Sequence, residues 1–199
     1  MTVQPRVLLI AGSPSEPSRS VALLDSVAQR LQNLPGVALD RLNIRTLPAP
    51  ALLLADWNHP AIVAAIDQVA KAKVVVVATP VYKAAYSGLL KVFLDLLSQT
   101  ALKDKTVLPL ATGGSPNHML ALDYALRPVL QALSARHILP GVYATDTQVP
   151  QAADKRYAIN PDIELRLDDA VSNLISEGLR LPATTGFEPV PFSRVRCSV

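Results

Sequence analysis

The stretch Val74-Val-Val-Val-Ala-Thr79 is the part of the chain that decides the fold class. It joins four β-branched residues in a row, which favours a strand. Its apolar residues do not alternate with polar ones, and such runs mark strands that are covered on both faces. A second run of this kind, Arg6 to Ala11, ends at Gly12-Ser13. Both runs indicate a parallel sheet with helices on each side.

Outward from this strand, strand and helix patterns alternate along the chain. Pro80 is expected to end the strand at 74–79, and Pro109 lies inside another predicted strand, where it removes a ladder hydrogen bond. The alternation predicts an α/β fold, a three-layer sandwich around a five-stranded parallel sheet. Residues 1–181 are expected to form one domain, followed by a proline-containing tail over 182–199. Strands are predicted at 6–11, 37–42, 74–79, 106–112 and 138–143, and helices at 21–31, 61–73, 87–99, 119–136 and 161–181.

Composition excludes several classes of protein. The chain has 199 residues, of which 50% are hydrophobic and 18% charged, and its net charge is +3. A charge this small, with no basic cluster, argues against nucleic acid as a partner. The single cysteine, Cys197, excludes an internal disulfide framework and a cysteine-built metal site. Since no signal-peptide pattern and no long apolar run occurs, we expect a cytoplasmic protein with no membrane span and no metal site.

Three loops that follow predicted strands carry unusual residues. Residues 12–20 hold four serines and an arginine just before a helix, where hydroxyls, backbone N–H groups and the helix dipole favour a phosphate. Residues 79–88 place a tyrosine directly after a strand, and residues 111–118 include two adjacent glycines that let a ligand approach the backbone. Neither the Walker pattern nor Gly-x-Gly-x-x-Gly occurs.

Each loop taken alone also fits a plain structural role. The first could be a polar loop whose Ser18 or Ser20 caps a helix, the second a strand stopped by proline, and the third an ordinary turn in which His118 makes a capping bond. However, ligands of open α/β sheets bind at the carboxyl ends of the strands, and all three loops lie on that edge. Together they describe a phosphate site beside a slot for a planar ring, which fits flavin mononucleotide (FMN) best.

Residues 6–143 resemble the NADPH-dependent FMN reductase family, and within it the flavin reductases of alkanesulfonate monooxygenase systems. The resemblance rests on Ala11-Gly-Ser-Pro14, Pro17-Ser-Arg-Ser20, Thr79-Pro-Val-Tyr-Lys-Ala-Ala-Tyr-Ser-Gly88, Leu110-Ala-Thr-Gly-Gly114, His118 and Leu122-Asp-Tyr-Ala-Leu126. It implies a flavodoxin-like fold with strand order 2-1-3-4-5. It also implies hydride transfer from NADPH or NADH to FMN, and delivery of reduced FMN to an FMNH2-dependent sulfonate monooxygenase.

The resemblance also implies roles for single residues. The phosphate would lie at Ser13, Ser18, Arg19 and Ser20; the ribityl chain and ring at Pro80, Val81, Tyr82 and Lys83; and the pyrimidine edge at Thr112, Gly113, Gly114 and Ser115, with His118 continuing the site. Ser15 stands where the family often has arginine, so more of the phosphate binding rests on Arg19. Tyr124 is implied to be an inserted residue that makes a π-bulge at the interface of a homo-oligomer, a tetramer or a dimer.

Three other functions remain open at this point. One is a quinone or azo-dye reductase with tightly bound FMN, and another is a non-enzymatic electron carrier of the flavodoxin type. The positive charge argues against a carrier, since flavodoxins are typically strongly acidic. A third is a structural or regulatory oligomer without flavin. No catalytic side chain is assigned, because the flavin itself carries the chemistry of hydride transfer.

Overall fold

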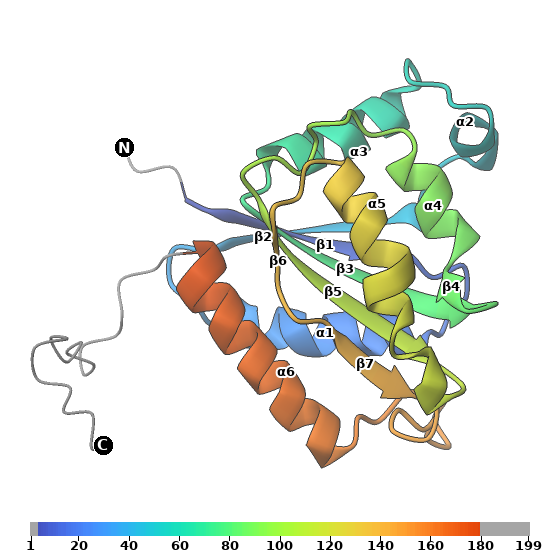
Figure 1. The fold of residues 1–199 in the computed structure, drawn as a ribbon, viewed down its shortest axis with the longest axis vertical. Coiled ribbons are helices and arrows are strands. Elements are labelled where there is room, and N and C mark those ends of the chain that lie inside the picture. Colours follow the sequence, from blue (N-terminus) through green and yellow to red (C-terminus); the bar gives the residue numbers. More distant parts are fainter. Residues whose placement is uncertain (1–3, 180–199) are drawn as a thin grey trace, which may run out of the picture.

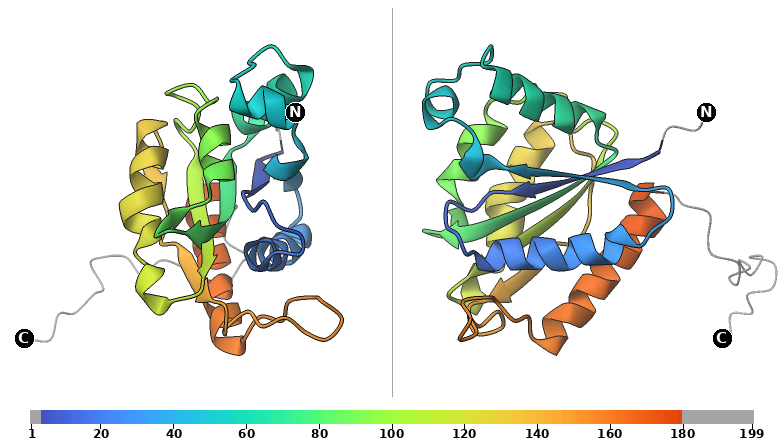
Figure 2. Two further views of the ribbon diagram at one scale, coloured as in Figure 1. Left: turned by 90° about the vertical axis from the view of Figure 1, so that its right-hand side faces the viewer. Right: turned by 180° about the vertical axis from the view of Figure 1, so that it is seen from behind.

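The computed structural model describes residues 4–179 and forms one twisted sheet between two layers of helices (Figures 1 and 2). The strands are β1 (Arg6–Ala11), β2 (Ala38–Asn43), β3 (Val74–Tyr82), β4 (Ala85–Tyr86), β5 (Thr106–Gly113), β6 (His137–Ile138) and β7 (Val142–Thr145). The α-helices are α1 (Arg19–Gln32), α2 (Ala49–Leu53), α3 (Pro60–Lys71), α4 (Gly88–Leu94), α5 (Arg127–Ala132) and α6 (Pro161–Asn173). Four further segments are the 3-10 turns η1 (Ile44–Thr46) and η2 (Pro116–His118) and the π-helices η3 (Leu122–Leu126) and η4 (Leu174–Leu179).

The main sheet is parallel and has the order β2-β1-β3-β5, followed by β6 and β7. Counted as one broken strand, β6 and β7 are the fifth strand, so the expected three-layer fold and its strand order are confirmed. Alternate residues of β1 enter opposite cores: Val7 and Leu9 pack with α1 and α6, while Leu8 and Ile10 pack with α3, α4 and α5. Burial on both faces explains why these strands read as unbroken apolar runs.

The prediction that Pro80 ends the central strand is wrong. β3 continues through Pro80, which lies opposite Thr112 of β5, and it ends at Tyr82. The neighbouring strand β1 ends opposite Ala78, so at Pro80 that side of β3 is no longer paired with β1. Proline is tolerated in a strand where a ladder bond is not required. The extra residues carry β3 beyond the sheet and into a short hairpin with β4.

Pro109 interrupts the sheet at its other side. β5 pairs with β6 at Thr106 and Val107 and with β7 from Leu110 onward, so the gap between β6 and β7 lies opposite Pro109. Because proline has no backbone N–H, the ladder cannot run unbroken past it. The strand predicted at 138–143 is therefore two short strands, His137–Ile138 and Val142–Thr145.

The helices differ from the predictions mainly at their ends. The helix predicted at 87–99 ends at Leu94, and the one predicted at 119–136 is a π-helix over Leu122–Leu126 followed by α5. The π-bulge implied for Tyr124 is thus confirmed as a structural feature. The last helix changes to π geometry at Leu174, and the predicted tail at 182–199 lies outside the described residues. Among residues 4–179, no helix has both the length and the hydrophobicity needed to span a bilayer.

Candidate functional site

The three strand-end loops meet in one cleft at the carboxyl edge of the sheet, with a volume of about 240 Å3. Residues from the β1–α1 loop, the end of β3 and the end of β5 form its walls, together with two residues that come from the segment after β7. The lining residues are Ser13, Ser15, Pro17, Ser18, Arg19, Pro80, Val81, Tyr82, Thr112, Gly113, Gly114, Asp146 and Tyr157. The convergence that the sequence predicted is therefore present in the fold.

A buried hydrogen-bond network holds the first two loops together. Ser87 Oγ donates to the carbonyl of Gly12 at 2.5 Å and accepts from the backbone N–H of Leu90 at 3.1 Å, so it caps α4 as well. Thr79 Oγ1 accepts from the Ser87 N–H at 3.0 Å and donates to the Pro80 carbonyl at 2.9 Å. Buried and satisfied networks of this kind fix local geometry. They set the β1–α1 loop against the end of β3.

One end of the cleft is suited to a phosphate. Helix α1 begins at Arg19, so its first backbone N–H groups and the positive end of its dipole face this loop. Ser18 stands at the N-cap position, but its hydroxyl pairs with Ser20 Oγ at 3.1 Å and, within residues 4–179, makes no capping bond. The N–H groups of the first turn thus keep their capacity to bind an anion. Ser13 and Ser15 add polar groups to the same wall.

Arg19 is held in place by the segment after β7. Its Nε donates to the Val149 carbonyl at 3.0 Å, and its Nη1 lies 3.7 Å from Asp146 Oδ2. The guanidinium also lies over the Tyr157 ring, 5.0 Å from the ring centroid, which is within cation–π range. Arg19 is therefore held in orientation by groups of the protein itself, and the carboxylate of Asp146 lies beside it in the cleft.

The extended end of β3, from Pro80 to Tyr82, forms the wall in the middle of the cleft. Val81 is buried there, while the side chain of Tyr82 is about half exposed. Tyr82 pairs with Ala85 across a two-residue turn in which Lys83 and Ala84 both have positive φ, at 50° and 62°. Left-handed backbone in residues with a Cβ is strained, and strain of this kind gathers at functional sites. The turn therefore fixes the position of the Tyr82 backbone at the wall of the cleft.

The other end of the cleft is closed by glycines. A Cβ on Gly113 would stand 2.6 Å from the Tyr143 hydroxyl and 3.2 Å from Val81 Cβ, so no side chain fits there. Tyr143 donates to the Ser115 carbonyl at 2.6 Å. Burial, together with the negative charge of Asp146, raises the pKa of the Tyr143 hydroxyl, which therefore stays protonated and remains a donor. Gly113 is thus required by its packing against Tyr143 and Val81, and both glycines line the cleft.

The structure places nine of the predicted binding residues in the cleft and four outside its walls. Ser20 is buried behind Ser18, and Lys83 lies in the exposed hairpin turn. Ser115 caps the turn η2, and His118 is half buried at the end of that turn. The residues that line the cleft are Ser13, Ser18, Arg19, Pro80, Val81, Tyr82, Thr112, Gly113 and Gly114. All thirteen roles stay predictions.

Sequence reasoning missed Asp146 and Tyr157. Both follow β7, and they reach the cleft only because that segment folds back over the start of α1, more than 120 residues away in sequence. Asp146 could have been suspected from its place directly after the fifth predicted strand, at the same sheet edge. Nothing in the sequence around Tyr157 marks it as a partner for Arg19. Within residues 4–179, no cluster of histidine, cysteine and acidic residues could hold a metal ion.

The residues of the cleft fit FMN. They supply hydroxyls, a fixed arginine and a helix N-terminus at one end, a flat extended backbone in the middle, and side-chain-free glycines at the other end. Comparison with known proteins gives the same answer, because the model of the NADPH-dependent FMN reductase family matches residues 5–149.

The chain belongs to the NADPH-dependent FMN reductase family. It is 48% identical over 166 residues to an FMN reductase (NADPH) of Escherichia coli K12, covering 83% of this chain and 86% of that protein. It is 47% identical over 166 residues to an FMN reductase (NADPH) of Pseudomonas putida KT2440, covering 83% and 84%. Among solved structures, the apo form of an NADH:FMN oxidoreductase, EmoB, superposes with a TM-score of 0.79 at 35% identity, covering 91% of this chain and 92% of that one.

Proposed function

We propose that this chain reduces FMN with NADPH or NADH and releases the reduced flavin to a separate FMNH2-dependent sulfonate monooxygenase. The observation that carries the proposal is the cleft itself. It lies at the carboxyl edge of a flavodoxin-like sheet and joins a helix N-terminus suited to a phosphate with the extended end of β3. Membership of the FMN reductase family supports the reaction. The identity of the acceptor enzyme follows from the resemblance to the sulfonate branch.

Each wall of the cleft has a part in this reaction. When bound, FMN would supply the redox chemistry of hydride acceptance from the nicotinamide. Arg19, Ser13, Ser18 and the first turn of α1 would hold its phosphate, and the backbone of β3 from Pro80 to Tyr82 would support its ring. The backbone N–H groups near Gly113 and Gly114 would stabilise negative charge at its pyrimidine edge. No side-chain acid or base is needed.

The cleft is also suited to releasing its flavin. The Arg19 side chain is about one-third exposed, and Asp146 competes with a phosphate for it. Screening by water and salt reduces what a partly exposed ion pair contributes to affinity. A reductase that passes reduced FMN to another enzyme needs a modest affinity for flavin, whereas a quinone or azo-dye reductase keeps its flavin bound.

Steady-state oxidation of NADPH and of NADH, each with and without added FMN, tests the proposal. We expect a colourless protein whose oxidation of NADPH depends on added FMN. NADPH is the expected donor, because the two reductases at 47–48% identity are named for it, while the EmoB structure is that of an NADH:FMN oxidoreductase. A yellow protein that does not exchange its flavin would instead support the bound-flavin alternative.

Addition of the acceptor enzyme tests the second half of the proposal. A mixture of this chain, NADPH, FMN, oxygen, an alkanesulfonate and an FMNH2-dependent alkanesulfonate monooxygenase should release sulfite from the sulfonate. Omission of this chain should stop the release. A cytoplasmic location and a single domain over 1–181 belong to the same proposal.

We also propose that the chain forms a homo-oligomer through the π-helix η3. Tyr124 on this helix is 78% exposed, and Met119 and Leu120 beside it are also exposed. Large exposed apolar side chains gathered in one place mark interaction surfaces. Replacement Tyr124→Asp should shift the protein to smaller species in sedimentation velocity. The control Leu165→Asp changes another exposed apolar residue, on α6, and should not shift it. Equal sedimentation of both variants and the parent would remove Tyr124 from an interface.

A further inference from the structure

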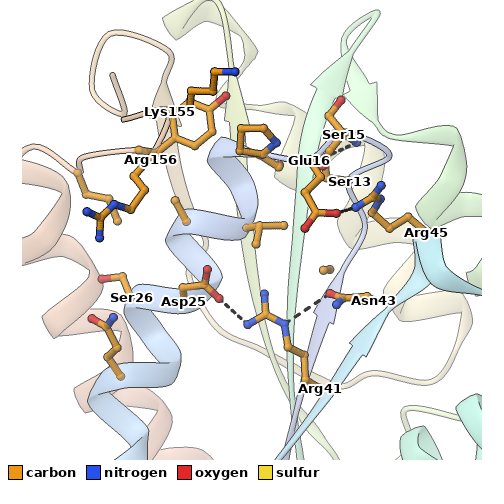
Figure 3. A pocket seen from close by; sticks show the side chains of 18 of the residues that line it. Ser13, Ser15, Glu16, Asp25, Ser26, Arg41, Asn43, Arg45, Lys155 and Arg156 are labelled. Carbon is orange, nitrogen blue, oxygen red and sulfur yellow. Dashed lines mark hydrogen bonds and ion pairs between the residues drawn. The ribbon is translucent and has the colours of Figure 1, made fainter. Parts of the chain in front are cut away.

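A second cavity, larger than the flavin cleft, lies between α1 and the edge strand β2. Its volume is about 630 Å3, and Figure 3 shows it bounded by α1, by β2 and the turn after it, and by a loop carrying Lys155 and Arg156. We call it the α1–β2 groove. It is lined by Ala11, Ser13, Ser15, Glu16, Pro17, Ser18, Val21, Ala22, Asp25, Ser26, Gln29, Arg41, Asn43, Arg45, Thr46, Lys155, Arg156, Tyr157, Ile159 and Glu164.

The groove and the flavin cleft meet at the phosphate site. Both are lined by Ser13, Ser15, Pro17, Ser18 and Tyr157, so the β1–α1 loop is their common wall. A ligand that fills both must therefore carry anionic groups near its middle and a bulky group on each side. That is the form of a dinucleotide, in which a pyrophosphate joins two nucleoside halves.

Four basic side chains line the groove, and three of them are paired with carboxylates, including Arg156 with Asp154. Arg41 and Arg45 enter from β2 and η1, and Lys155 and Arg156 enter from the loop on the opposite side (Figure 3). Arg41 is held by Asp25 at 2.5 Å and lies 3.4 Å from Asn43 Oδ1, while Glu16 pairs with Arg45. The two arginines are therefore fixed in orientation. Lys155 forms no ion pair within residues 4–179, so its charge is open to an anionic ligand.

The floor of the groove suits a purine. Val21, Ala22 and Ile159 give it an apolar surface of partly buried side chains. Around this surface stand Gln29 and Asn43, whose amides can accept from the amino group of adenine and donate to its ring nitrogens. Asp25 and Glu164 also line it and can only accept, and each already accepts from an arginine. An apolar cavity of several hundred Å3 with a few polar groups is typical of small-molecule sites.

We propose that the α1–β2 groove binds the adenylate half of an adenine dinucleotide whose other half reaches the flavin cleft. The inference rests on the proposed function and adds a subsite to it. The dinucleotide that fits this arrangement is FAD, because its flavin-side phosphate would take the same place as the phosphate of FMN. NADPH has to bind together with FMN, whose phosphate already fills that place. The experiment compares FAD with FMN, which lacks the adenylate, and NADPH with reduced nicotinamide mononucleotide.

Two variants probe the groove, and one serves as a control. Arg41→Ala removes a groove cation, and Gln29→Trp adds bulk at an exposed position of α1 that lines the groove. The control Arg6→Ala removes an arginine that also pairs with an acid across β1 and β2, Asp40, but at the far end of these strands. Circular dichroism confirms that each variant is folded.

The measurements are equilibrium dissociation constants for FAD and FMN by flavin fluorescence, and KM values for NADPH and reduced nicotinamide mononucleotide. If the groove binds the adenylate of FAD, both groove variants weaken FAD at least fivefold and change FMN less than twofold. If it binds the adenylate of the pyridine nucleotide instead, the KM for NADPH rises at least fivefold while the values for FAD and for the mononucleotide stay within twofold, and the proposal is overturned. Arg6→Ala should change none of the four values.

The proposal is also overturned if FAD responds to the groove variants no more than FMN does. The proposed function has a separate test in the parent protein, since FMN binding and FMN reduction by reduced nicotinamide mononucleotide involve no adenylate. A parent that fails these two measurements refutes FMN reduction. A parent that passes them, with unresponsive groove variants, refutes only the adenylate subsite.

Discussion

Replacement of Arg19 by alanine is the most direct test of the phosphate site. In the structure, Arg19 Nε donates a hydrogen bond to the Val149 carbonyl, and the guanidinium packs over the Tyr157 ring. Within residues 4–179, the two terminal nitrogens make no hydrogen bond, and the only ion-pair contact is the loose one of 3.7 Å to Asp146. These nitrogens are therefore placed to donate to a phosphate at small entropic cost.

The size of the effect follows from this geometry. A hydrogen bond between charged groups contributes about 1.5–3 kcal/mol, which corresponds to roughly a 10- to 150-fold change in affinity. Because the Arg19 side chain is about one-third exposed, screening by water and salt favours the lower half of that range. We therefore expect Arg19→Ala to raise the dissociation constant for FMN by about 10- to 40-fold.

Fluorescence titration with FMN and with riboflavin measures this effect. Riboflavin lacks the phosphate, so its affinity should change less than about twofold if Arg19 acts through the phosphate. Arg6→Ala, which removes a surface arginine outside the cleft, controls for the loss of charge. The reasoning is refuted if FMN binding is unchanged, or if riboflavin weakens as much as FMN, because the second result would mean that Arg19 only supports the loop that it tethers.

Three further predictions follow from the same site and its surroundings. Asp146→Asn should tighten FMN binding by about two- to fivefold and leave riboflavin unchanged, since it removes an exposed carboxylate that competes for Arg19; fluorescence titration that showed no tightening would contradict this. Ala84→Gly should raise the free energy of unfolding by about 0.5–1 kcal/mol in urea titrations, because φ is 62° at this position and glycine adopts that backbone without strain. Tyr143 has its pKa raised in the folded state, so the stability it contributes is present below the unfolded value near 10.0 and is lost as the pH rises through the folded value. Urea unfolding between pH 9 and 11 should therefore show a steeper loss of stability for the parent than for Tyr143→Phe, which at neutral pH is less stable by about 1 kcal/mol through loss of the bond to the Ser115 carbonyl.

The parallel sheet could be predicted because burial on both faces leaves a direct signal in the sequence. Val74 to Ala78 and Val7 to Ala11 are buried residue after residue, and unbroken apolar runs report this. The three loops of the site could be predicted for a related reason. The carboxyl ends of parallel strands share one edge, so local patterns at Gly12, Tyr82 and Gly113 imply one place in space.

The prolines show where local reasoning is insufficient. A proline inside a strand is unfavourable only if its missing N–H leaves a partner unsatisfied, and this depends on which strands lie beside it. Pro80 continues β3 because β1 has already ended, whereas Pro109 divides the neighbouring strand into β6 and β7. Neither outcome can be predicted from the residues next to the proline in the sequence.

By itself, the sequence determined the layered α/β fold, the edge of the sheet at which the cleft lies, and several residues that line it: Ser13, Ser18, Arg19 and the two glycines. These features depend on hydrophobic pattern and on residues next to strand ends, and both are local. Only the tertiary structure decided that Asp146 and Tyr157 hold Arg19, and that Arg41 and Lys155 stand across the α1–β2 groove. Such contacts join segments more than 100 residues apart, and their geometry is set by how the helices and the last loop pack on the sheet.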